Sequence, residues 1–266
     1  MYKLSVCGIA KNEQHGLREW VHYHRLVGVE HFYIYDNDSA VPVRETLAKE
    51  IASEYVTCIE FSGPSKQMPA YNHYLSNFGK DTQWAAMIDA DEFMVPKKTN
   101  SVLDVLDSFI NYASLQVNWV IFGSGGHLTR PQGLVIENYT QSSPSSYKEN
   151  LHTKAIVQPS KIQCAGSNPH YFIPLRGFFV VGENFEGVPN AWSKTHNVET
   201  IQLNHYTIKS LEDFHAKIAK GRADAVHLPT AQLHHFESIN SFCTERDNSI
   251  FRFIEPTKRL MYPDIG

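Results

Sequence analysis

Residues 84–93, WAAMIDADEF, decide the fold. Five apolar residues run directly into three carboxylates, Asp89, Asp91 and Glu92. A short continuous apolar run predicts a strand that is buried on both faces of a sheet. The carboxylates cannot belong to the core, because a buried carboxylate is costly unless it is paired or bound to a metal. We therefore expect them at the C-terminal end of the strand, where open α/β sheets bind their ligands.

The spacing of Asp89 and Asp91 indicates a joint role. Two residues apart on an extended chain, their side chains point the same way, roughly 6–7 Å from one another. That separation suits a hard divalent cation with a polar ligand between the carboxylates. The alternative is an acidic turn between a strand and a loop, because an isolated Asp-x-Asp is common.

The first hundred residues alternate between strand and helix patterns. Strands are predicted at 3–10, 31–35, 55–61 and 84–88, and helices at 17–27, 42–54 and 67–78. This alternation predicts a mostly parallel sheet with right-handed crossovers. The chain contains neither GxGxxG nor GxxxxGK[ST], which argues against a dinucleotide dehydrogenase and a P-loop NTPase.

After Pro96 the regular alternation of strand and helix patterns ends. A helix is expected from Ser101 to Ile110 and another from Ser210. Residues 127–150 are interpreted as a long surface segment and residues 182–200 as irregular. Short strands are expected at 117–122, 154–158, 177–181 and 201–203.

Composition excludes several classes of protein. The 266 residues are 42% hydrophobic and 20% charged, with a net charge of −4, so no nucleic-acid surface is indicated. No run of eighteen apolar residues predicts a spanning helix. The first strand follows Met1 directly, which predicts no signal peptide. The four cysteines are far apart and are interpreted as reduced thiols of a cytoplasmic protein.

Several short motifs together carry a resemblance. They are Ala10-Lys11-Asn12-Glu13, Glu19-Trp20, Tyr35-Asp36-Asn37, Gln67, Asp89 to Phe93, and Asn204-His205-Tyr206-x-x-Lys209-Ser210. In this order the set resembles glycosyltransferases of the GT-A fold, in the family-2-like branch related to glycosyltransferase family 92. The resemblance covers roughly residues 3–222. It implies one GT-A-like α/β domain over 1–266, with a Rossmann-like, mostly parallel nucleotide-sugar half at 1–98, an acceptor half with a smaller β/α portion at 99–225 and an extension at 226–266.

The resemblance also implies a metal site. A nucleotide-sugar would lie across the sheet, with its diphosphate on a divalent ion held by the Asp-x-Asp motif. Such an ion acts as a Lewis acid on the leaving diphosphate. Oxygen ligands suit Mn²⁺ or Mg²⁺, and one imidazole favours Mn²⁺. We assign Asp91 to the ion, Asp89 to the ribose hydroxyls or a metal-bound water, His205 to the third ligand position, and His170 to the same role as a second candidate. Either histidine could instead be a capping or core residue.

The remaining donor contacts follow from the same resemblance. Asp36 would accept the imide N–H of a pyrimidine, although an Asx turn explains the same residue. The others are Ala10, Asn12 and Glu13 around base and ribose, Gln67 and Asn72 near ribose or diphosphate, and Lys209, Lys217 and Arg222 against the diphosphate or an anionic acceptor. For Gln67, Asn72 and the basic residues, solvated helix side chains are the alternative.

The catalytic base is left open among three carboxylates. The resemblance favours inversion, which needs a carboxylate to deprotonate the acceptor hydroxyl. Candidates are Glu183, Glu186 and Asp224, whereas Glu92 is predicted to hold the loop after the acidic strand. Trp119 and Trp192 either stack on acceptor sugars or belong to the core.

The sequence thus predicts a metal-dependent glycosyltransferase that uses a UDP-sugar and a glycan or lipid-linked acceptor at the inner membrane face. Peripheral membrane contact through residues 251–260 is one interpretation of the C-terminus, and a packed terminal helix is the other. Two other functions stay open. A sugar-nucleotide nucleotidyltransferase would share the acidic site but usually shows a G-x-G-T-R loop, which is missing. A non-catalytic nucleotide- or sugar-binding protein would share the fold.

Overall fold

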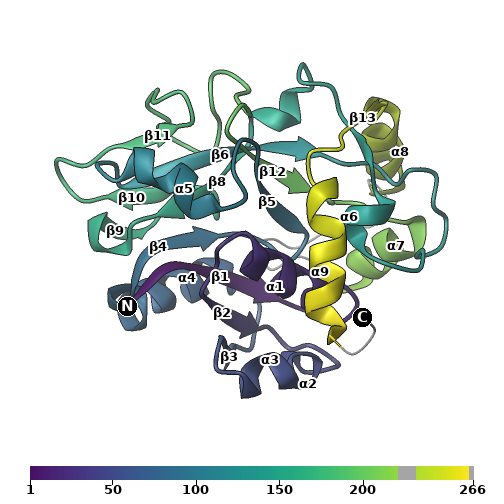
Figure 1. Cartoon of the computed structure of the whole chain (residues 1–266), viewed down its shortest axis with the longest axis horizontal. Coiled ribbons are helices and arrows are strands. Elements are labelled where there is room, and N and C mark those ends of the chain that lie inside the picture. Colours follow the sequence, from purple (N-terminus) through teal and green to yellow (C-terminus); the bar gives the residue numbers. More distant parts are fainter. Residues whose placement is uncertain (221–231, 264–266) are drawn as a thin grey trace.

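One mixed sheet organises the computed structural model, which describes residues 1–220 and 232–263 (Figure 1). Eight strands follow one another across it, and β11 (Val180–Gly182) pairs with β6 beside them. In spatial order the eight are β3 (Val56–Glu60), β2 (His31–Asp36), β1 (Tyr2–Ala10), β4 (Thr82–Met87), β8 (Thr153–Val157), β6 (Ser114–Ile121), β12 (Ile201–His205) and β5 (Glu92–Pro96).

The first half of the sheet is parallel, as the strand–helix alternation predicts. β1 pairs in parallel with β2 and β4, and β2 with β3. The second half is mixed, because β8 runs antiparallel to β4 and β6, while β12 is parallel to β6 and antiparallel to β5. The predicted fold class, an α/β fold built on a mostly parallel sheet, is confirmed.

Alternating side chains bury both faces of the central strands. In β1, Val6 belongs to one apolar core and Cys7 to the other, and Ile34 and Tyr35 of β2 divide in the same way. A strand buried on both faces reads as a continuous apolar run. This explains why β4 shows no polar alternation until the chain reaches its acidic end.

The α-helices of the described residues are distributed along the whole sequence between the strands. They are α1 (Leu17–Leu26), α2 (Val43–Thr46), α3 (Ala48–Ala52), α4 (Gln67–Asn77), α5 (Val102–Leu106), α6 (Val135–Asn138), α7 (Leu211–Lys220), α8 (Gln232–Phe242) and α9 (Ile254–Met261). Two short ladders lie outside the main sheet, β9 (Ile162–Ala165) with β10 (Phe172–Pro174) and β7 (Gln141–Ser142) with β13 (Glu245–Arg246).

Helix α1 fixes β5, the strand that follows the acidic residues. Trp20 donates from Nε1 to the Glu92 carbonyl at 2.8 Å, and Tyr23 donates to the Met94 carbonyl at 2.8 Å. The Met94 N–H in turn donates to Nε2 of His24 at 3.2 Å. The helix ends at Gly28, whose φ of +108° puts it in the left-handed region that glycine favours. These bonds connect the Glu19-Trp20 motif directly to the acidic loop.

Three sequence expectations need correction. The helix predicted over 42–54 is two short helices, α2 and α3. The strand β5 was not predicted. The segment 127–150 is not wholly a surface loop, because Ile136 and Asn150 are fully buried.

The C-terminal helix α9 lies beside α1 (Figure 1). Phe253 just before it is buried and packs edge-on against Tyr23, with ring centroids 5.7 Å apart. This is the packed terminal helix that the sequence left as one of two interpretations. In the described part of the chain no helix is long and apolar enough to cross a bilayer.

Candidate active site

The acidic loop between β4 and β5 is closed by Glu92. The Asp89 N–H donates to Oε2 of Glu92 at 2.8 Å, and Nε1 of Trp119 donates to Oε1 at 2.8 Å. Glu92 is fully buried. The prediction that Glu92 holds the loop is therefore confirmed.

Asp89 turns toward the sheet, where it is bound on both oxygens. Oδ2 accepts from Nζ of Lys154 at 2.7 Å, and Oδ1 accepts from Nε2 of Gln67 at 2.8 Å. The Lys154 side chain is only 1% exposed and also lies 3.5 Å from Oε2 of Glu92. Burial alone would lower the pKa of Lys154, but the charges of Asp89 and Glu92 outweigh it and raise that pKa above its usual range. Lys154 is thus a charged, buried residue that fixes Asp89.

Asp91 turns toward a cleft instead. Its Oδ2 accepts from Nζ of Lys217 at 2.7 Å, and its Oδ1 lies 3.7 Å from Nε2 of His205. Burial would raise the pKa of Asp91, but Lys217 and then His205 hold it well below its usual range. Asp91 is therefore ionised and available to a cation.

His205 is buried beside Asp91 with weak hydrogen bonding. Burial lowers the pKa of this imidazole, which favours the neutral form that ligates metals. Its Nδ1 is buried and has no hydrogen-bond partner among the described residues. The His205 ring packs on Trp119, with centroids 4.3 Å apart. His170 packs edge-on against the same Trp119 at 5.2 Å and donates from Nδ1 to the Thr153 carbonyl at 2.9 Å.

A cleft of about 440 Å³ opens above Asp91. Its walls are the loop after β1, the segment from Tyr206 to Lys209, and one side of α7. It brings together several residues predicted from the sequence, namely Asn12, Glu13, Asp91, Lys209 and Lys217. It also contains Arg130 and Lys220, which the sequence did not single out as site residues.

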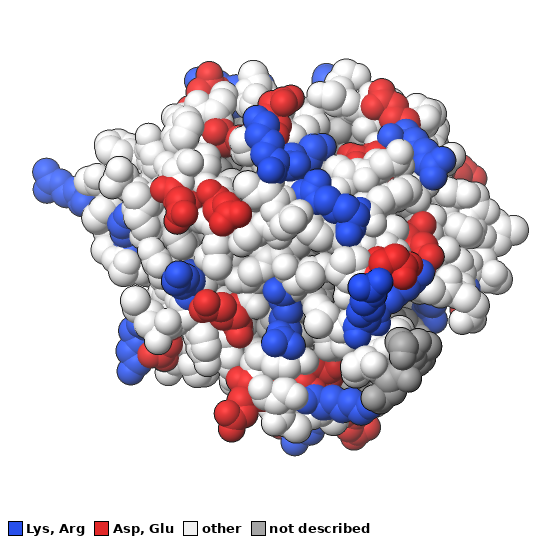
Figure 2. All heavy atoms as spheres, in the orientation of Figure 1, with Lys and Arg blue, Asp and Glu red and all other residues white. Residues whose placement is uncertain are grey.

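Most cations of the cleft already have an acidic partner. Lys217 pairs with Asp91, Lys220 with Glu13, and Arg130 with Asp213. Lys209 differs, because among the described residues it has no ion-pair partner. On the face of the molecule drawn in Figure 2, the basic and acidic side chains that the structure describes are interspersed and form no large patch of one sign. With no ion-pair partner within the described part of the chain, Lys209 gives the cleft a positive charge for an anionic ligand.

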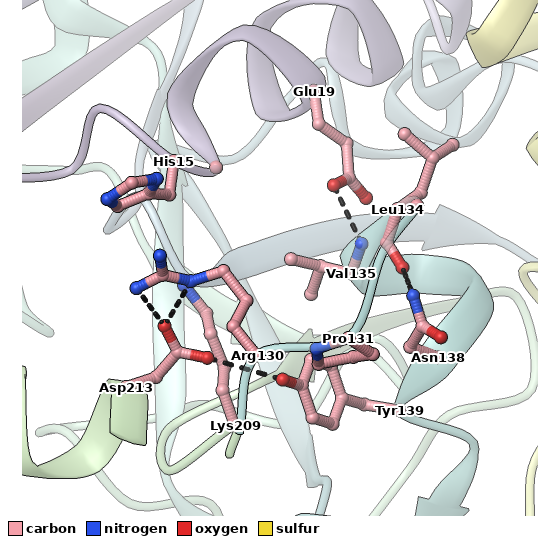
Figure 3. A pocket seen from close by; sticks show the side chains of 12 residues that line it. His15, Glu19, Arg130, Pro131, Leu134, Val135, Asn138, Tyr139, Lys209 and Asp213 are labelled. Carbon is pink, nitrogen blue, oxygen red and sulfur yellow. Dashed lines mark hydrogen bonds and ion pairs between the residues drawn. The ribbon is translucent and has the colours of Figure 1, made fainter. Parts of the chain in front are cut away.

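A side pocket of about 40 Å³ shares Arg130, Lys209 and Asp213 with the lining of the cleft, and Figure 3 shows the residues around it. Arg130 binds Oδ1 of Asp213 through Nε at 2.7 Å, and Ser210 donates to Oδ2 at 2.6 Å. Tyr139 reaches the same carboxylate at 3.3 Å. This network ties the start of α7 to Arg130 and Tyr139, which lie on either side of α6 in the sequence.

Glu19 lines the opposite wall of the side pocket. Its carboxylate accepts the N–H groups of Val135 at 2.7 Å and Ile136 at 3.0 Å, at the start of α6. Burial raises the pKa of Glu19 to about 7. Figure 3 shows Glu19 directed at this backbone and away from Lys209. The role of Glu19 in the Glu19-Trp20 motif is therefore to hold the start of α6 at the side pocket.

The residues predicted around the nucleotide occupy two zones. Asn12 lines the cleft and accepts the Ala40 N–H at 2.7 Å on Oδ1, with a left-handed φ of +54° that Asn tolerates. Asp36 is buried behind it, and its two oxygens accept the N–H groups of Ser39 at 3.1 Å and Val43 at 2.9 Å. These hydrogen bonds form the Asx turn that the sequence offered as the alternative to a base contact for Asp36.

The other predicted donor residues lie further from the cleft. Ala10 is buried opposite Asp36 in the β1–β2 register. Gln67 contacts Asp89, as described above. Asn72 accepts the Ala165 N–H of β9 at 2.9 Å. None of the three lines the cleft.

The predicted catalytic carboxylates are not gathered at the cleft. Glu183 accepts the N–H groups of Glu199 at 2.8 Å and Thr200 at 2.7 Å. Glu186 is exposed in the turn after β11. Neither lines the cleft. Asp224, like Arg222, lies outside the described residues.

The structure adds Lys154, Arg130 and Asp213 to the residues identified from the sequence. In the sequence Lys154 is the charged residue directly before the apolar run 155–157. Asp213 is recognisable as a capping residue after Ser210, and its Arg130 partner is 83 residues away.

Comparison with known proteins decides the family. The sequence model of glycosyltransferase family 92 matches residues 2–238. The chain belongs to glycosyltransferase family 92. The relationship expected from the Asp-x-Asp and Asn-His-Tyr motifs is therefore confirmed.

Named members of family 92 are distant and longer. A family 92 protein of Oryza sativa subsp. japonica, Os08g0121900, is 28% identical over 167 residues, which are 60% of this chain and 28% of that protein. A family 92 protein of Arabidopsis thaliana, At1g27200, is 26% identical over 231 residues, 81% of this chain and 37% of that protein. The chain therefore spans about a third of the length of these relatives.

A solved structure with a similar chain course is that of S. aureus TarS residues 1–349 in complex with UDP. It is 14% identical and has a TM-score of 0.41, over 59% of this chain and 47% of that one.

Proposed function

We propose that this family 92 chain transfers a sugar from a UDP-sugar to a hydroxyl of a glycan or lipid-linked acceptor, with a divalent cation and with inversion. The observation that carries the proposal is the cleft at the acidic end of β4. Its volume of about 440 Å³ is that of a small-molecule site. Asp91 contributes a carboxylate to it, and Lys209, Lys217 and Lys220 contribute positive charge. This is the charge pattern that a metal-bound diphosphate needs.

Asp91 and His205 fit a divalent cation. The distance of 3.7 Å between Oδ1 of Asp91 and Nε2 of His205 is close to that of two ligands sharing one ion. Among residues 1–220 and 232–263 no three His, Cys, Asp or Glu side chains converge on one point. Mg²⁺ often takes only one or two carboxylates and fills its shell with water and phosphate oxygens. When bound, the ion would stabilise the charge that grows on the leaving diphosphate.

The remaining predicted ligands have supporting roles in this proposal. Asp89, held by Lys154 and Gln67, would bind the ribose hydroxyls or a metal-bound water. His170 is the alternative imidazole. Asn12 and Glu13 would lie along the ribose. Asp36 uses one lone pair of each oxygen on backbone N–H groups, which leaves acceptor capacity for the imide of uracil.

For the base we propose Asp224. Each carboxylate that lines the cleft within the described residues is paired with a lysine or arginine, and a paired carboxylate is a poor proton acceptor. Glu183 is bound by three backbone N–H groups, and Glu186 lies away from the cleft. Asp224→Asn should lower the transfer rate about 10²–10⁴-fold and leave metal-dependent UDP affinity within about twofold. Loss of UDP binding in this variant would assign Asp224 to the donor site instead.

Calorimetric titration of UDP with and without Mn²⁺ tests the proposal. We expect binding by the wild type that requires Mn²⁺ and disappears in Asp91→Ala. A screen of UDP-sugars for slow donor hydrolysis then identifies the sugar. If the wild type bound UDP under neither condition, the UDP-sugar part of the proposal would be wrong, and GDP-, CMP- and dTDP-sugars would be screened. Metal-dependent UDP binding without hydrolysis or transfer of any donor would favour the non-catalytic alternative.

A further inference from the structure

Lys217 is bound to Oδ2 of Asp91, beside Oδ1, the oxygen that lies 3.7 Å from Nε2 of His205. It lies on α7, and its Nζ donates to Oδ2 of Asp91 at 2.7 Å and to the Thr207 carbonyl at 2.8 Å. The Lys217 side chain is 38% exposed and lines the cleft. Oγ1 of Thr207 lies a further 3.4 Å from Nζ, and the part-exposed Lys217 side chain borders the space where a nucleotide would lie.

A divalent ion and this ammonium group compete for one carboxylate. Asp91 carries a single negative charge, and Lys217 already neutralises it at hydrogen-bond distance. An ion held by Asp91 and His205 would lie close to Nζ, where like charges repel strongly because the site is partly buried. The repulsion is removed only if Lys217 leaves or if a second anion enters the cleft.

The diphosphate of the donor is such an anion. Lysine has a flexible stem and three rotatable donors, so its ammonium group can turn from one oxygen ligand to another. Lys220, about one turn further along α7, lines the same cleft and forms an ion pair with Glu13. A diphosphate in the cleft would therefore find Lys217 within reach of its oxygens.

We infer that Lys217 neutralises the Asp91 carboxylate when no nucleotide is bound, and moves to the donor diphosphate when metal and nucleotide bind together. The inference rests on the proposed function and assigns Lys217 as a positioning residue that couples the two ligands. The metal alone binds weakly because it must displace Lys217. With the nucleotide present, the displaced ammonium group gains a new anionic partner, which makes the binding of metal and nucleotide mutually favourable.

Lys217→Met separates this role from a structural one. With Mn²⁺ alone, followed by the electron paramagnetic resonance signal of the free ion, we expect the variant to bind about tenfold more tightly than the wild type, because the competing charge is gone. With saturating Mn²⁺, we expect it to bind UDP about tenfold more weakly, because the diphosphate has lost a partner. A variant that only disturbs the fold would weaken both.

Two matched variants serve as controls. Lys220→Met removes the same charge from the same helix and cleft but leaves Asp91 paired, so its affinity for Mn²⁺ alone should change less than about threefold. Asp91→Asn combined with Lys217→Met should show no gain in Mn²⁺ affinity. If Lys217→Met were poorly folded by circular dichroism, Lys217→Gln would repeat the test.

The outcomes separate this inference from the proposed function. Unchanged or weaker binding of Mn²⁺ alone by Lys217→Met overturns the inference, even if the wild type shows Mn²⁺-dependent UDP binding. Unchanged UDP affinity with saturating Mn²⁺ overturns it too. A wild type that binds no UDP at any Mn²⁺ concentration overturns the proposed function, and the titration with Mn²⁺ alone still decides whether Lys217 blocks the ion.

Discussion

The two carboxylates of the Asp-x-Asp motif each hold a lysine at 2.7 Å, but the two lysines lie in different surroundings. Lys154, beside Asp89, is 1% exposed and has Glu92 as a second acidic neighbour. Lys217, beside Asp91, is 38% exposed and faces the cleft. The difference indicates that one carboxylate belongs to the framework of the sheet and the other to the ligand site.

The topology explains this division. β8 runs antiparallel beside β4, with Ala155 opposite Met87, so the preceding Lys154 is brought to the end of β4. Lys217 comes from α7, which follows β12 and forms a wall of the cleft. A strand in the sheet cannot move away from Asp89, whereas a lysine on a helix at the cleft can turn.

The largest effect is expected from Asp91→Asn. If Asp91 holds the ion, the transfer rate should fall about 10³-fold or more, because the stabilisation of the leaving diphosphate is lost. The free energy of unfolding should change by only about 1 kcal/mol, because Lys217 can turn to solvent. Transfer assays and urea denaturation measure the two quantities. A large loss of stability would place Asp91 in the framework as well.

Lys154→Met should affect stability most. It leaves the carboxylates of Asp89 and Glu92 without their buried cation, and breaking a buried pair costs about 3–5 kcal/mol. Lys217→Met should cost about 1 kcal/mol or less, because its pair is part-exposed. Urea denaturation of the two variants compares them directly. Equal losses would mean that the two lysines do not differ as their exposure indicates.

Double-mutant cycles give the smallest and most specific effect. Combining Asp89→Asn with Lys154→Met should show a coupling energy of about 2 kcal/mol in the free energy of unfolding, because the two groups are in contact and Lys154 is buried, although the Asp89 side chain is 34% exposed. Combining Asp91→Asn with Lys217→Met should show less than about 1 kcal/mol. A coupling at Asp91 as large as that at Asp89 would remove the distinction between the pairs.

The sequence predicted the acidic end of β4 because the signal there is local. The apolar run 84–88 predicts the buried strand, and the carboxylates directly after it can only lie at the C-terminal end of that strand. The strand β5 was missed because it begins at the acidic Glu92, directly after the turn at Ala90-Asp91, and because its partner β12 lies more than a hundred residues later. Local patterns do not report such a partner.

The same limit applies to the site. Asn12, Glu13, Asp91 and Lys209 were identified through motifs, and the structure places all four in one cleft. The pairing of Asp89 with Lys154 depends on β8 lying next to β4 in the sheet. The spacing of residues along the sequence does not reveal which strands are neighbours. Asp36 shows a different limit, because an Asp after a strand predicts an Asx turn and a base contact equally well.

The most direct test of this account compares Mn²⁺ binding by Asp91→Asn and Asp89→Asn in the presence of saturating UDP, measured by the electron paramagnetic resonance signal of the free ion. We expect Asp91→Asn to lose the bound Mn²⁺. Asp89→Asn should keep one bound ion per chain, with weaker UDP affinity. Retention of Mn²⁺ by Asp91→Asn together with its loss in Asp89→Asn would contradict the assignment of ligand site and framework.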